Sequence, residues 1–317
     1  MKAVFLDYAT MGGGLDVSPL QSAVDELVIH DATPDDAVAD RIRDADAVLT
    51  NKIRLTPALI GAAQRLKFIG LTATGTDNID LDAAREHGIA VANIRDYCTR
   101  SVVEHVFGLL LMLTHSLPLF HRSVRKGLWQ KSEDPFLLNH PVRELSAMTL
   151  GIVGHGALGR GVAATGQAFG MDVLISARPG SGQVPEGRVA FDDLLARSDV
   201  VSLHCPLNDQ TRGLIGAREL EAMKNTAILV NTARGGLVDS RALADALRNG
   251  VIGAAAVDVL PHEPPAGGDP LLDYDGDNLI VTPHIAWASN EARQNAIEEL
   301  AANIRAFSNG ESRNRVV

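Results

Sequence analysis

Three short segments carry side chains of the kinds that bind carboxylates and move protons. They read NTARGGLVD, DVLPHEPP and TPHIAWAS, and each follows an apolar run typical of a buried strand. Their candidate functional residues are Arg234, Glu263 and His284. The carboxyl ends of parallel strands lie at one edge of a sheet, and open α/β sheets bind ligands at that edge. The pattern therefore predicts that an arginine, a carboxylate and a histidine lie together.

Each of these three side chains suits one step in the reduction of a 2-keto acid by hydride. The planar guanidinium of Arg234 can bind the carboxylate of the acid and polarise its carbonyl group. His284 can deliver a proton to the developing alkoxide near neutral pH. Glu263 can orient the imidazole ring and favour its protonated form. We therefore expect a hydride to move between a nicotinamide and C2 of a small 2-keto or 2-hydroxy acid.

A glycine-rich segment after another apolar run predicts the dinucleotide site. The stretch LGIVGHGALGRG contains a G-x-G-x-x-G fingerprint. The first glycine makes a tight turn, the second lets the backbone approach a pyrophosphate, and the third lets the following helix pack closely on the strand. The helix N-terminus then favours the phosphate charge. The residues expected to contact the cofactor here are Gly154, His155, Gly156, Ala157, Leu158 and Gly159.

The end of the next strand indicates which dinucleotide is used. An acid about 20 residues past the fingerprint usually binds the ribose, but Asp172 begins its strand and would lie at the opposite end of the sheet. The strand instead ends at Ala177, which is followed by Arg178. Ala177 leaves room for a 2′-phosphate and Arg178 can pair with it, so NADP is favoured over NAD. The alternative is that Arg178 is only an exposed loop cation.

Two series of alternating strands and helices must position these residues. Such alternation predicts βαβ units, parallel sheets and an α/β fold. The strands expected in the first series are Val4–Leu6, Leu27–Ile29, Ala47–Leu49, Phe68–Leu71 and Ile89–Ala92, with helices at Leu20–Glu26, Pro34–Arg43, Thr56–Ala63 and Leu81–His87. Those of the second series are Leu150–Val153, Asp172–Ile175, Val200–Leu203, Ala227–Asn231, Ala254–Asp258 and Leu279–Thr282. A last helix, about Glu291–Ser308, is expected to pack back on the first series.

A long apolar helix is expected between the two series. The stretch SVVEHVFGLLLMLTHSL, from Ser101 to about Leu117, has too little polar face for an exposed helix. An arm from Phe120 to Glu144 follows it and contains Trp129. The apolar run Phe107–Leu113 and this arm predict a homodimer, because so apolar a surface needs cover on most sides.

Composition and charge argue against several classes of protein. A net charge of −10 disfavours a general nucleic-acid binder. No run of 18 consecutive apolar residues is present, so no membrane span is expected. The only two cysteines, Cys98 and Cys205, fit a reducing cytoplasm better than a disulfide framework. His155, His204 and His262 share no metal-ligand spacing, and we expect no metal.

The motifs VGHGALG, HCPLNDQTRGLI, NTARGGLVD, AAAVDVLPHEPP and TPHIAWAS, preceded by ATGTDNID, occur in an order that resembles the D-isomer-specific 2-hydroxyacid dehydrogenase family. The resemblance extends over essentially the whole chain. It implies the roles argued above for Arg234, Glu263 and His284. It also implies that backbone amides of Thr74 and Gly75 hold the substrate carboxylate. Further cofactor contacts that it implies are Cys205, Pro206, Thr232, Ala233 and Asp258, the last facing the nicotinamide carboxamide.

The same resemblance implies the organisation of the chain. The family fold is two Rossmann-like domains with the active site in the cleft between them. Residues 1–98 plus 288–317 would form the substrate-binding domain, and residues 99–287 the dinucleotide-binding domain. Family members are usually homodimers joined through the long helix and the arm.

Two shorter stretches, LNHPVREL and NKIRL, resemble glycerate dehydrogenases, also called hydroxypyruvate reductases. Reduction of hydroxypyruvate or glyoxylate to D-glycerate or glycolate is then expected. NAD is typical of those enzymes, whereas Ala177 stands where many family members carry Asp.

Two alternative functions stay open at this point: a phosphoglycerate dehydrogenase of the short type, and a dinucleotide-sensing corepressor of the same fold. A formate dehydrogenase is disfavoured, because that relative carries Gln where Glu263 stands. Lys52, His262 and Trp287 receive no role, and the sequence decides neither the physiological acid nor the direction of the reaction.

Overall fold

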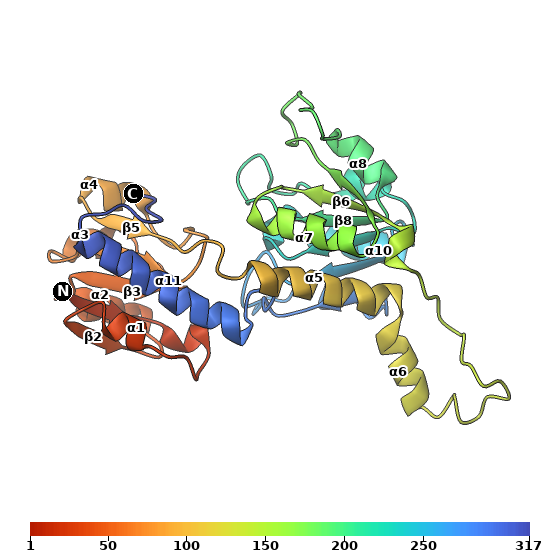
Figure 1. Ribbon diagram of the computed structural model, residues 1–317, viewed down its shortest axis with the longest axis horizontal. Coiled ribbons are helices and arrows are strands. Elements are labelled where there is room, and N and C mark those ends of the chain that lie inside the picture. Colours follow the sequence, from red (N-terminus) through yellow and green to blue (C-terminus); the bar gives the residue numbers. More distant parts are fainter. The chain divides into compact units, whose positions relative to one another are not determined.

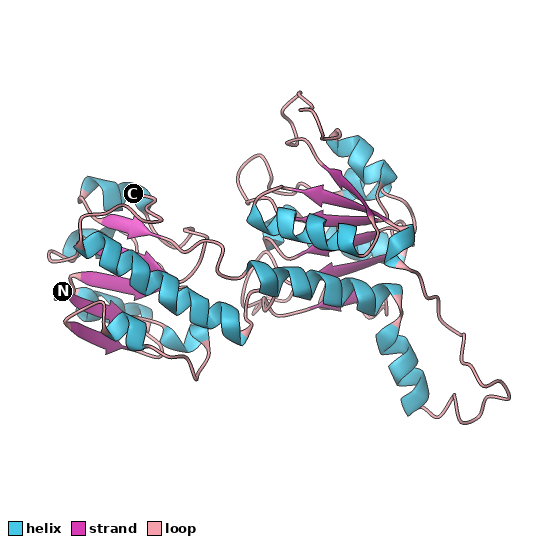
Figure 2. Cartoon of the chain, in the orientation of Figure 1, coloured by secondary structure: helices cyan, strands magenta, loops and turns pink.

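The computed structural model describes residues 1–317, which divide into two compact units (Figure 1). The first unit contains Met1–Cys98 and Trp287–Val317, and the second contains Thr99–Ala286. Each unit has one parallel β-sheet with helices packed on it (Figure 2). The α/β fold with two parallel sheets is therefore confirmed.

The first unit has a five-stranded sheet in the order β2-β1-β3-β4-β5. This is the 2-1-3-4-5 order of a doubly wound fold. Its strands are β1 Lys2–Phe5, β2 Glu26–Ile29, β3 Ala47–Thr50, β4 Phe68–Leu71 and β5 Ala90–Ala92. Its helices are η1 Tyr8–Met11, α1 Ser18–Gln21, η2 Asp35–Ala37, α2 Val38–Ile42, α3 Pro57–Ala62, α4 Leu81–Glu86 and α11 Asn290–Ser308.

The last helix, α11, covers one face of the first sheet, as expected. Ser289 caps its N-terminus by accepting a hydrogen bond from the Ala292 amide. Its residues Ile297, Leu300 and Ile304 are fully buried against the sheet. Both ends of the chain thus belong to the same unit.

The second unit has a six-stranded sheet in the order β11-β10-β9-β8-β6-β7. The strands are β6 Thr149–Val153, β7 Asp172–Ile175, β8 Val200–Leu203, β9 Ile228–Asn231, β10 Ala254–Val257 and β11 Leu279–Val281. The helices are α5 Thr99–Thr114, α6 Leu117–Arg125, η3 Leu145–Ala147, α7 Ala157–Ala168, α8 Phe191–Arg197, α9 Ala217–Glu221, η4 Gly235–Leu237 and α10 Ser240–Arg248.

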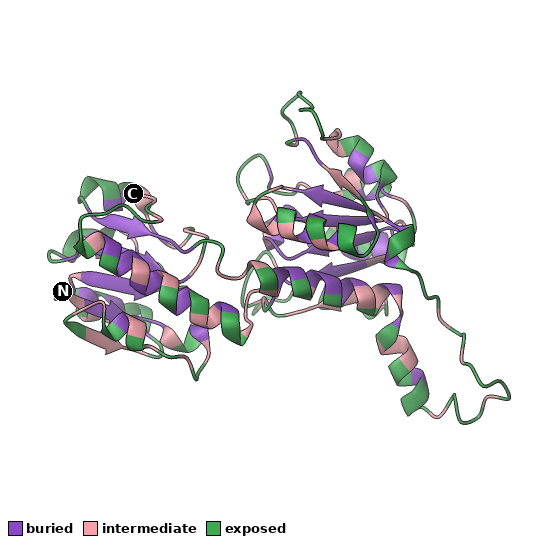
Figure 3. Cartoon of the chain, in the orientation of Figure 1, coloured by how far each residue is buried: buried purple, intermediate pink, exposed green.

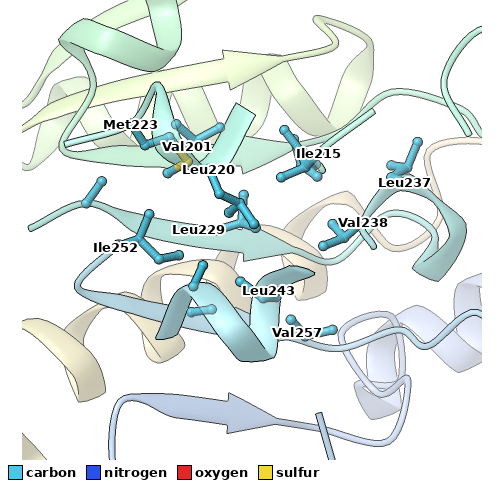
Figure 4. Packing of buried hydrophobic residues seen from close by; sticks show 14 of the residues in the cluster. Val201, Ile215, Leu220, Met223, Leu229, Leu237, Val238, Leu243, Ile252 and Val257 are labelled. Atoms are coloured by element: carbon cyan, nitrogen blue, oxygen red, sulfur yellow. The ribbon is translucent and has the colours of Figure 1, made fainter. Parts of the chain in front are cut away.

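The core of the second unit is aliphatic, which agrees with the low aromatic content of 4% (Figure 4). Leu229 and Val230, neighbours in β9, are both fully buried although they point to opposite faces of the sheet. Strands that are covered on both faces read as continuous apolar runs. This is why the strands of this sheet were predictable from hydrophobicity alone.

Three helix predictions differ from the structure. The long helix ends at Thr114 and not at Leu117, because Ser116 adopts a left-handed conformation with φ 50°. A second helix, α6, then starts at Leu117 with Pro118 in its first turn. The expected helix Leu20–Glu26 is wrong in its position, since α1 ends at Gln21 and Glu26 already opens β2. The helix expected over Pro34–Arg43 begins with a short 3₁₀ turn, η2.

The segment of residues 126–144 contains neither helix nor strand and is mostly exposed (Figure 3). The predicted arm is therefore α6 followed by this irregular segment. No single helix of the chain is long and apolar enough to cross a membrane; only α5 and α6 together, bent by 56°, satisfy the length and composition required.

Candidate active site

The carboxyl-terminal edge of the second sheet gathers the predicted residues of this unit. Loops after β6, β7 and β8 carry the fingerprint and the expected ribose and phosphate contacts. Loops after β9, β10 and β11 carry Arg234, Glu263 and His284. Neighbouring strands lie about 4.8 Å apart, so the edge from β7 to β11 extends roughly 24 Å. The edge thus offers an elongated site, with the catalytic candidates at one end.

The fingerprint glycines meet the steric demands of a dinucleotide loop. Gly154 has φ 96°, and a Cβ there would lie 2.5 Å from the Cys205 amide nitrogen. A Cβ on Gly159 would lie 2.0 Å from the Gly154 carbonyl oxygen. A Cβ on Gly156, in contrast, would meet nothing within 4 Å. The first and third glycines are required by the protein itself, whereas the second leaves an open approach to the backbone that suits a pyrophosphate.

The fingerprint also lies where the strand order of the sheet reverses. β6 pairs with β7 on one side and with β8 on the other, so the chain leaves β6 at the switch point of the sheet. The twelve-residue helix α7 begins there at Ala157, with no acidic residue in its first turn. Its N-terminal amides therefore present positive potential to an anion. Residues Gly154 to Gly159 fit the cofactor that the sequence predicts.

The end of β7 carries a second arginine, Arg188, in addition to Arg178. Ala177 is buried, and Arg178 donates to the Gln210 side-chain oxygen at 3.0 Å. Arg188 donates to the Ser176 carbonyl oxygen at 3.0 Å. Partial burial, followed by the positive charges of Arg188 and Arg160, lowers the pKa of His155. Arg178 and Arg188 thus both lie near the end of β7.

Arg188 was missed in the sequence because nothing local marks it. It lies ten residues after Arg178, in a stretch without regular structure. An isolated parallel bridge between Ser176 and Val189 brings it to the end of β7. Such a bridge depends on tertiary pairing, which hydrophobic periodicity does not report.

Hydrogen bonds within the loop after β9 fix the backbone at Arg234. The Asn231 side chain donates to the Arg234 carbonyl oxygen at 2.9 Å and accepts from the Ala233 amide at 3.1 Å. A Cβ on Gly235 would lie 2.0 Å from the Leu260 carbonyl carbon, so the loops after β9 and β10 touch at this glycine. This contact brings the loop of Arg234 against the loop that carries Glu263.

Glu263 and His284 form a direct pair. His284 Nδ1 lies 2.5 Å from Glu263 Oε2, and the other carboxylate oxygen accepts from the Leu260 amide at 2.8 Å. Their side chains are 28% and 33% exposed, so the imidazole ring is held but still reachable. Because Nδ1 faces the carboxylate, we expect Nε2 to be the nitrogen that exchanges a proton with a ligand.

Asp258 directly follows β10 and is buried. One of its carboxylate oxygens accepts from Thr282 Oγ1 at 2.5 Å and from the Ile285 amide at 2.9 Å. The other accepts from the Ala286 amide at 2.9 Å. Both oxygens are therefore already engaged by the loop that carries His284. The expected contact with the nicotinamide carboxamide stays a prediction.

The remaining cofactor candidates line the same edge. Cys205 and Pro206 follow β8, and Thr232 and Ala233 follow β9. Burial raises the pKa of the Cys205 thiol, which does not favour a nucleophilic role. The loss of surrounding water lowers the pKa of His204 to about 4, and its Nε2 lies 2.8 Å from the Ser202 hydroxyl oxygen. No group of three or more His, Cys, Asp or Glu side chains is arranged to hold a metal ion.

Thr74 and Gly75 belong to the first unit, in the loop after β4. Thr74 Oγ1 donates to the Ile94 carbonyl oxygen at 2.9 Å, and the Thr74 carbonyl oxygen accepts from the Asn93 side chain at 2.7 Å. Their proposed part in substrate binding stays a prediction. In the same unit the Lys52 backbone amide donates to Asp7 at 2.6 Å, and the Trp287 ring packs against Tyr97 with centroids 6.4 Å apart.

Comparison with known proteins identifies relatives of the whole chain. A family profile described as "D-isomer specific 2-hydroxyacid dehydrogenase, NAD binding domain" matches residues 107–286. A glycerate dehydrogenase from Methylorubrum extorquens is 43% identical over 285 residues, which are 90% of this chain and 89% of the relative.

Two solved structures share the fold of the entire chain. An acyclic imino acid reductase in complex with NADPH and D-Arg superposes with a TM-score of 0.87 at 28% identity, covering 100% of both chains. A D-lactate dehydrogenase from Aquifex aeolicus, complexed with NAD and lactic acid, gives 0.81 at 31% identity, covering 98% of this chain and 96% of that one.

Proposed function

The chain belongs to the D-isomer-specific 2-hydroxyacid dehydrogenase family and is an NAD(P)-dependent 2-hydroxyacid dehydrogenase; on that premise we propose that it reduces hydroxypyruvate or glyoxylate to D-glycerate or glycolate. The observation that carries the chemistry is the Glu263–His284 pair, which lies on loops next to that of Arg234. The choice of acid is supported by the similarity to a glycerate dehydrogenase.

In this proposal Arg234, His284 and Glu263 each have a separate role in the reaction. When bound, the nicotinamide supplies the hydride that reaches C2 of the keto acid. Arg234 binds the carboxylate and keto oxygen of the acid and polarises the carbonyl group. His284 transfers the proton on Nε2 to the keto oxygen as negative charge develops there. Glu263, on Nδ1, stabilises the imidazolium before transfer and holds the ring in place.

The other functions weighed from the sequence have less support. A corepressor would need the dinucleotide but not a histidine and a carboxylate 2.5 Å apart, and the matching family profile is described as that of a dehydrogenase. A short phosphoglycerate dehydrogenase would need further cations for the substrate phosphate. A cytoplasmic location is proposed from the two free cysteines.

Steady-state kinetics with a panel of 2-keto acids tests the proposal. The panel contains hydroxypyruvate, glyoxylate, pyruvate and phosphohydroxypyruvate, each assayed with NADPH and with NADH. We expect the highest kcat/KM for hydroxypyruvate or glyoxylate, and NADPH to serve at least as well as NADH. A preference for the phosphorylated acid would favour phosphoglycerate dehydrogenase, and the absence of turnover on any keto acid would refute the proposal.

The expected use of NADPH rests on the end of β7. Ala177 stands where an acid would repel a 2′-phosphate, and Arg178 and Arg188 place positive charge near the end of the same strand. A hydrogen bond to a charged group is worth roughly 1.5–3 kcal/mol, and about 1.4 kcal/mol is a tenfold preference. In the same assay the Ala177→Asp variant should move the NADPH/NADH ratio of kcat/KM about tenfold or more towards NADH. An unmoved ratio would mean that the ribose lies elsewhere.

We also propose that the protein is a homodimer joined through α6 and residues 126–144. Eight of the twelve exposed large hydrophobic side chains lie between residues 112 and 142: Met112, Leu117, Val124, Leu128, Trp129, Phe136, Leu138 and Val142. Leu138 is 84% exposed and Phe136 is 72% exposed. A monomer rarely leaves so many apolar side chains of one segment in water.

Light scattering should therefore report twice the chain mass of 33.7 kDa at micromolar concentration. The double variant Trp129→Glu/Leu138→Glu should lower the measured mass towards that of one chain. Leu272→Glu serves as the matched control, since Leu272 is also exposed but lies outside the segment. A monomeric mass for the unmodified protein would contradict the proposal.

A further inference from the structure

The loop that carries His284 adopts a backbone conformation that needs external support. His284 has φ 55°, in the left-handed region that non-glycine residues rarely adopt. Such a conformation costs free energy and persists only where surrounding contacts determine it. The backbone helps, because the His284 amide donates to the Asp258 carbonyl oxygen at 2.7 Å. The other contacts that hold residues 282–286 are therefore part of what places the imidazole ring.

The Asp258 carboxylate supplies most of that support. It accepts hydrogen bonds from Thr282 Oγ1, which precedes His284, and from the Ile285 and Ala286 amides, which follow it. The loop thus folds around one buried carboxylate. Hydrogen bonds to a buried charge are stronger than those between neutral groups.

The number of protons in this network determines the direction of the hydrogen bond between Thr282 and His105. Thr282 has one hydroxyl proton, and at 2.5 Å from Asp258 Oδ1 that proton must lie on the line to the carboxylate. Thr282 Oγ1 also lies 3.1 Å from Nε2 of His105, a residue of α5. The hydroxyl oxygen has no second proton to give, so it must accept from His105. His105 therefore donates through Nε2–H, and the same nitrogen lies 3.6 Å from Asp258 Oδ1.

Helix α5 contacts the other end of the loop as well. Ser101 lies one helical turn before His105, on the same face of α5. Its hydroxyl donates to the Ala286 carbonyl oxygen at 2.7 Å. Two side chains of α5 thus hold the loop at Thr282 and at Ala286, on either side of His284.

We propose that His105 is a positioning residue for the reaction: by donating to Thr282 it orients the hydroxyl that completes the Asp258 network, and through that network it sets the place of the His284 ring. The inference rests on the proposed role of His284 as proton donor. Its effect should fall on kcat more than on the KM of the keto acid, because Arg234 is held by a different loop. A merely structural histidine would change stability and leave the kinetic constants of the folded protein alone.

The test compares His105→Leu with His105→Gln in the full-length protein. Leucine fills the space but cannot donate, whereas the side-chain nitrogen of glutamine reaches about as far as histidine Nε2 and can donate to Thr282. With hydroxypyruvate and NADPH, we expect kcat to fall about tenfold in His105→Leu, with KM within threefold, and most of the loss to be recovered in His105→Gln. Wild-type kcat in His105→Leu, or equal losses in both variants with unchanged melting temperatures, would overturn the proposal.

A second pair of variants keeps the proposal testable if His105→Leu does not fold. Thr282→Ser keeps the hydroxyl and should retain kcat, whereas Thr282→Val removes it and should lower kcat about tenfold. Where the double variant His105→Leu/Thr282→Val folds, it should lose no more than Thr282→Val alone, because that substitution already breaks the bonds to both His105 and Asp258. Additive losses, or equal kcat in Thr282→Ser and Thr282→Val, would overturn it.

The His284→Ala variant, measured in the same assay, distinguishes a failure of the proposed role of His105 from a failure of the proposed role of His284. If His284→Ala is inactive while His105→Leu is fully active, only the role of His105 fails. If His284→Ala keeps wild-type turnover, the role of His284 as proton donor fails, and the role of His105 fails with it; the proposed function itself fails only if the unmodified protein turns over no keto acid.

Discussion

Replacing His284 by alanine is expected to lower kcat by about 10²- to 10⁴-fold, the usual contribution of general acid catalysis. The variant loses the imidazole that Glu263 holds at 2.5 Å, which is the group that we propose delivers the proton. Cofactor affinity should change little, because the fingerprint loop lies on different strands of the sheet. The measurements are kcat and KM for hydroxypyruvate and a fluorescence titration with NADPH.

His262→Ala is the matched control for this experiment. His262 precedes Glu263, is exposed, and has no role in the proposed mechanism. It should keep near wild-type turnover. Near wild-type turnover in His284→Ala itself would remove the histidine from the mechanism, and a loss of NADPH binding in that variant would mean that the loop had been displaced.

Arg234→Lys is expected to lower kcat/KM for the keto acid about 10- to 100-fold. Lysine keeps the positive charge but loses the planar fork that binds a carboxylate through two parallel hydrogen bonds. One lost hydrogen bond to a charged group is worth roughly 1.5–3 kcal/mol, which corresponds to that range. The KM of NADPH should be nearly unchanged.

The control for this variant is Arg241→Lys. Arg241 is exposed on α10, seven residues along the chain, and has no role in the proposed mechanism. It should behave as wild type. An Arg234→Lys protein with unchanged kcat/KM would show that Arg234 is a surface cation and would leave the substrate carboxylate without its proposed partner.

Much of the fold could be predicted because each of its strands is marked by a short apolar stretch of the sequence. The strands Asp172–Ile175 and Val200–Leu203 were predicted with the bounds that the structure gives them. Buried parallel strands are short apolar runs, and their ends place the following residues at one edge of a sheet. The pairing of Glu263 with His284 follows from that rule, since β10 and β11 are neighbours.

The helices were less predictable where tertiary contacts decide them. The apolar pattern after Thr99 continues past residue 114, but Ser116 turns left-handed and α6 restarts at Leu117. An apolar pattern indicates that a segment is buried, but it does not indicate where the chain changes direction.

By itself the sequence determined the α/β class, the dinucleotide loop, and the three side chains that we propose act on the substrate, because strand ends and glycine spacings are local properties of the chain. Only the tertiary structure decided which other residues join them. The bridge between Ser176 and Val189 brings Arg188 to the end of β7. The packing of α5 beside β10 brings His105, 177 residues away in the chain, to Thr282. Both contacts link segments with no shared period or spacing, so the folded chain alone places them.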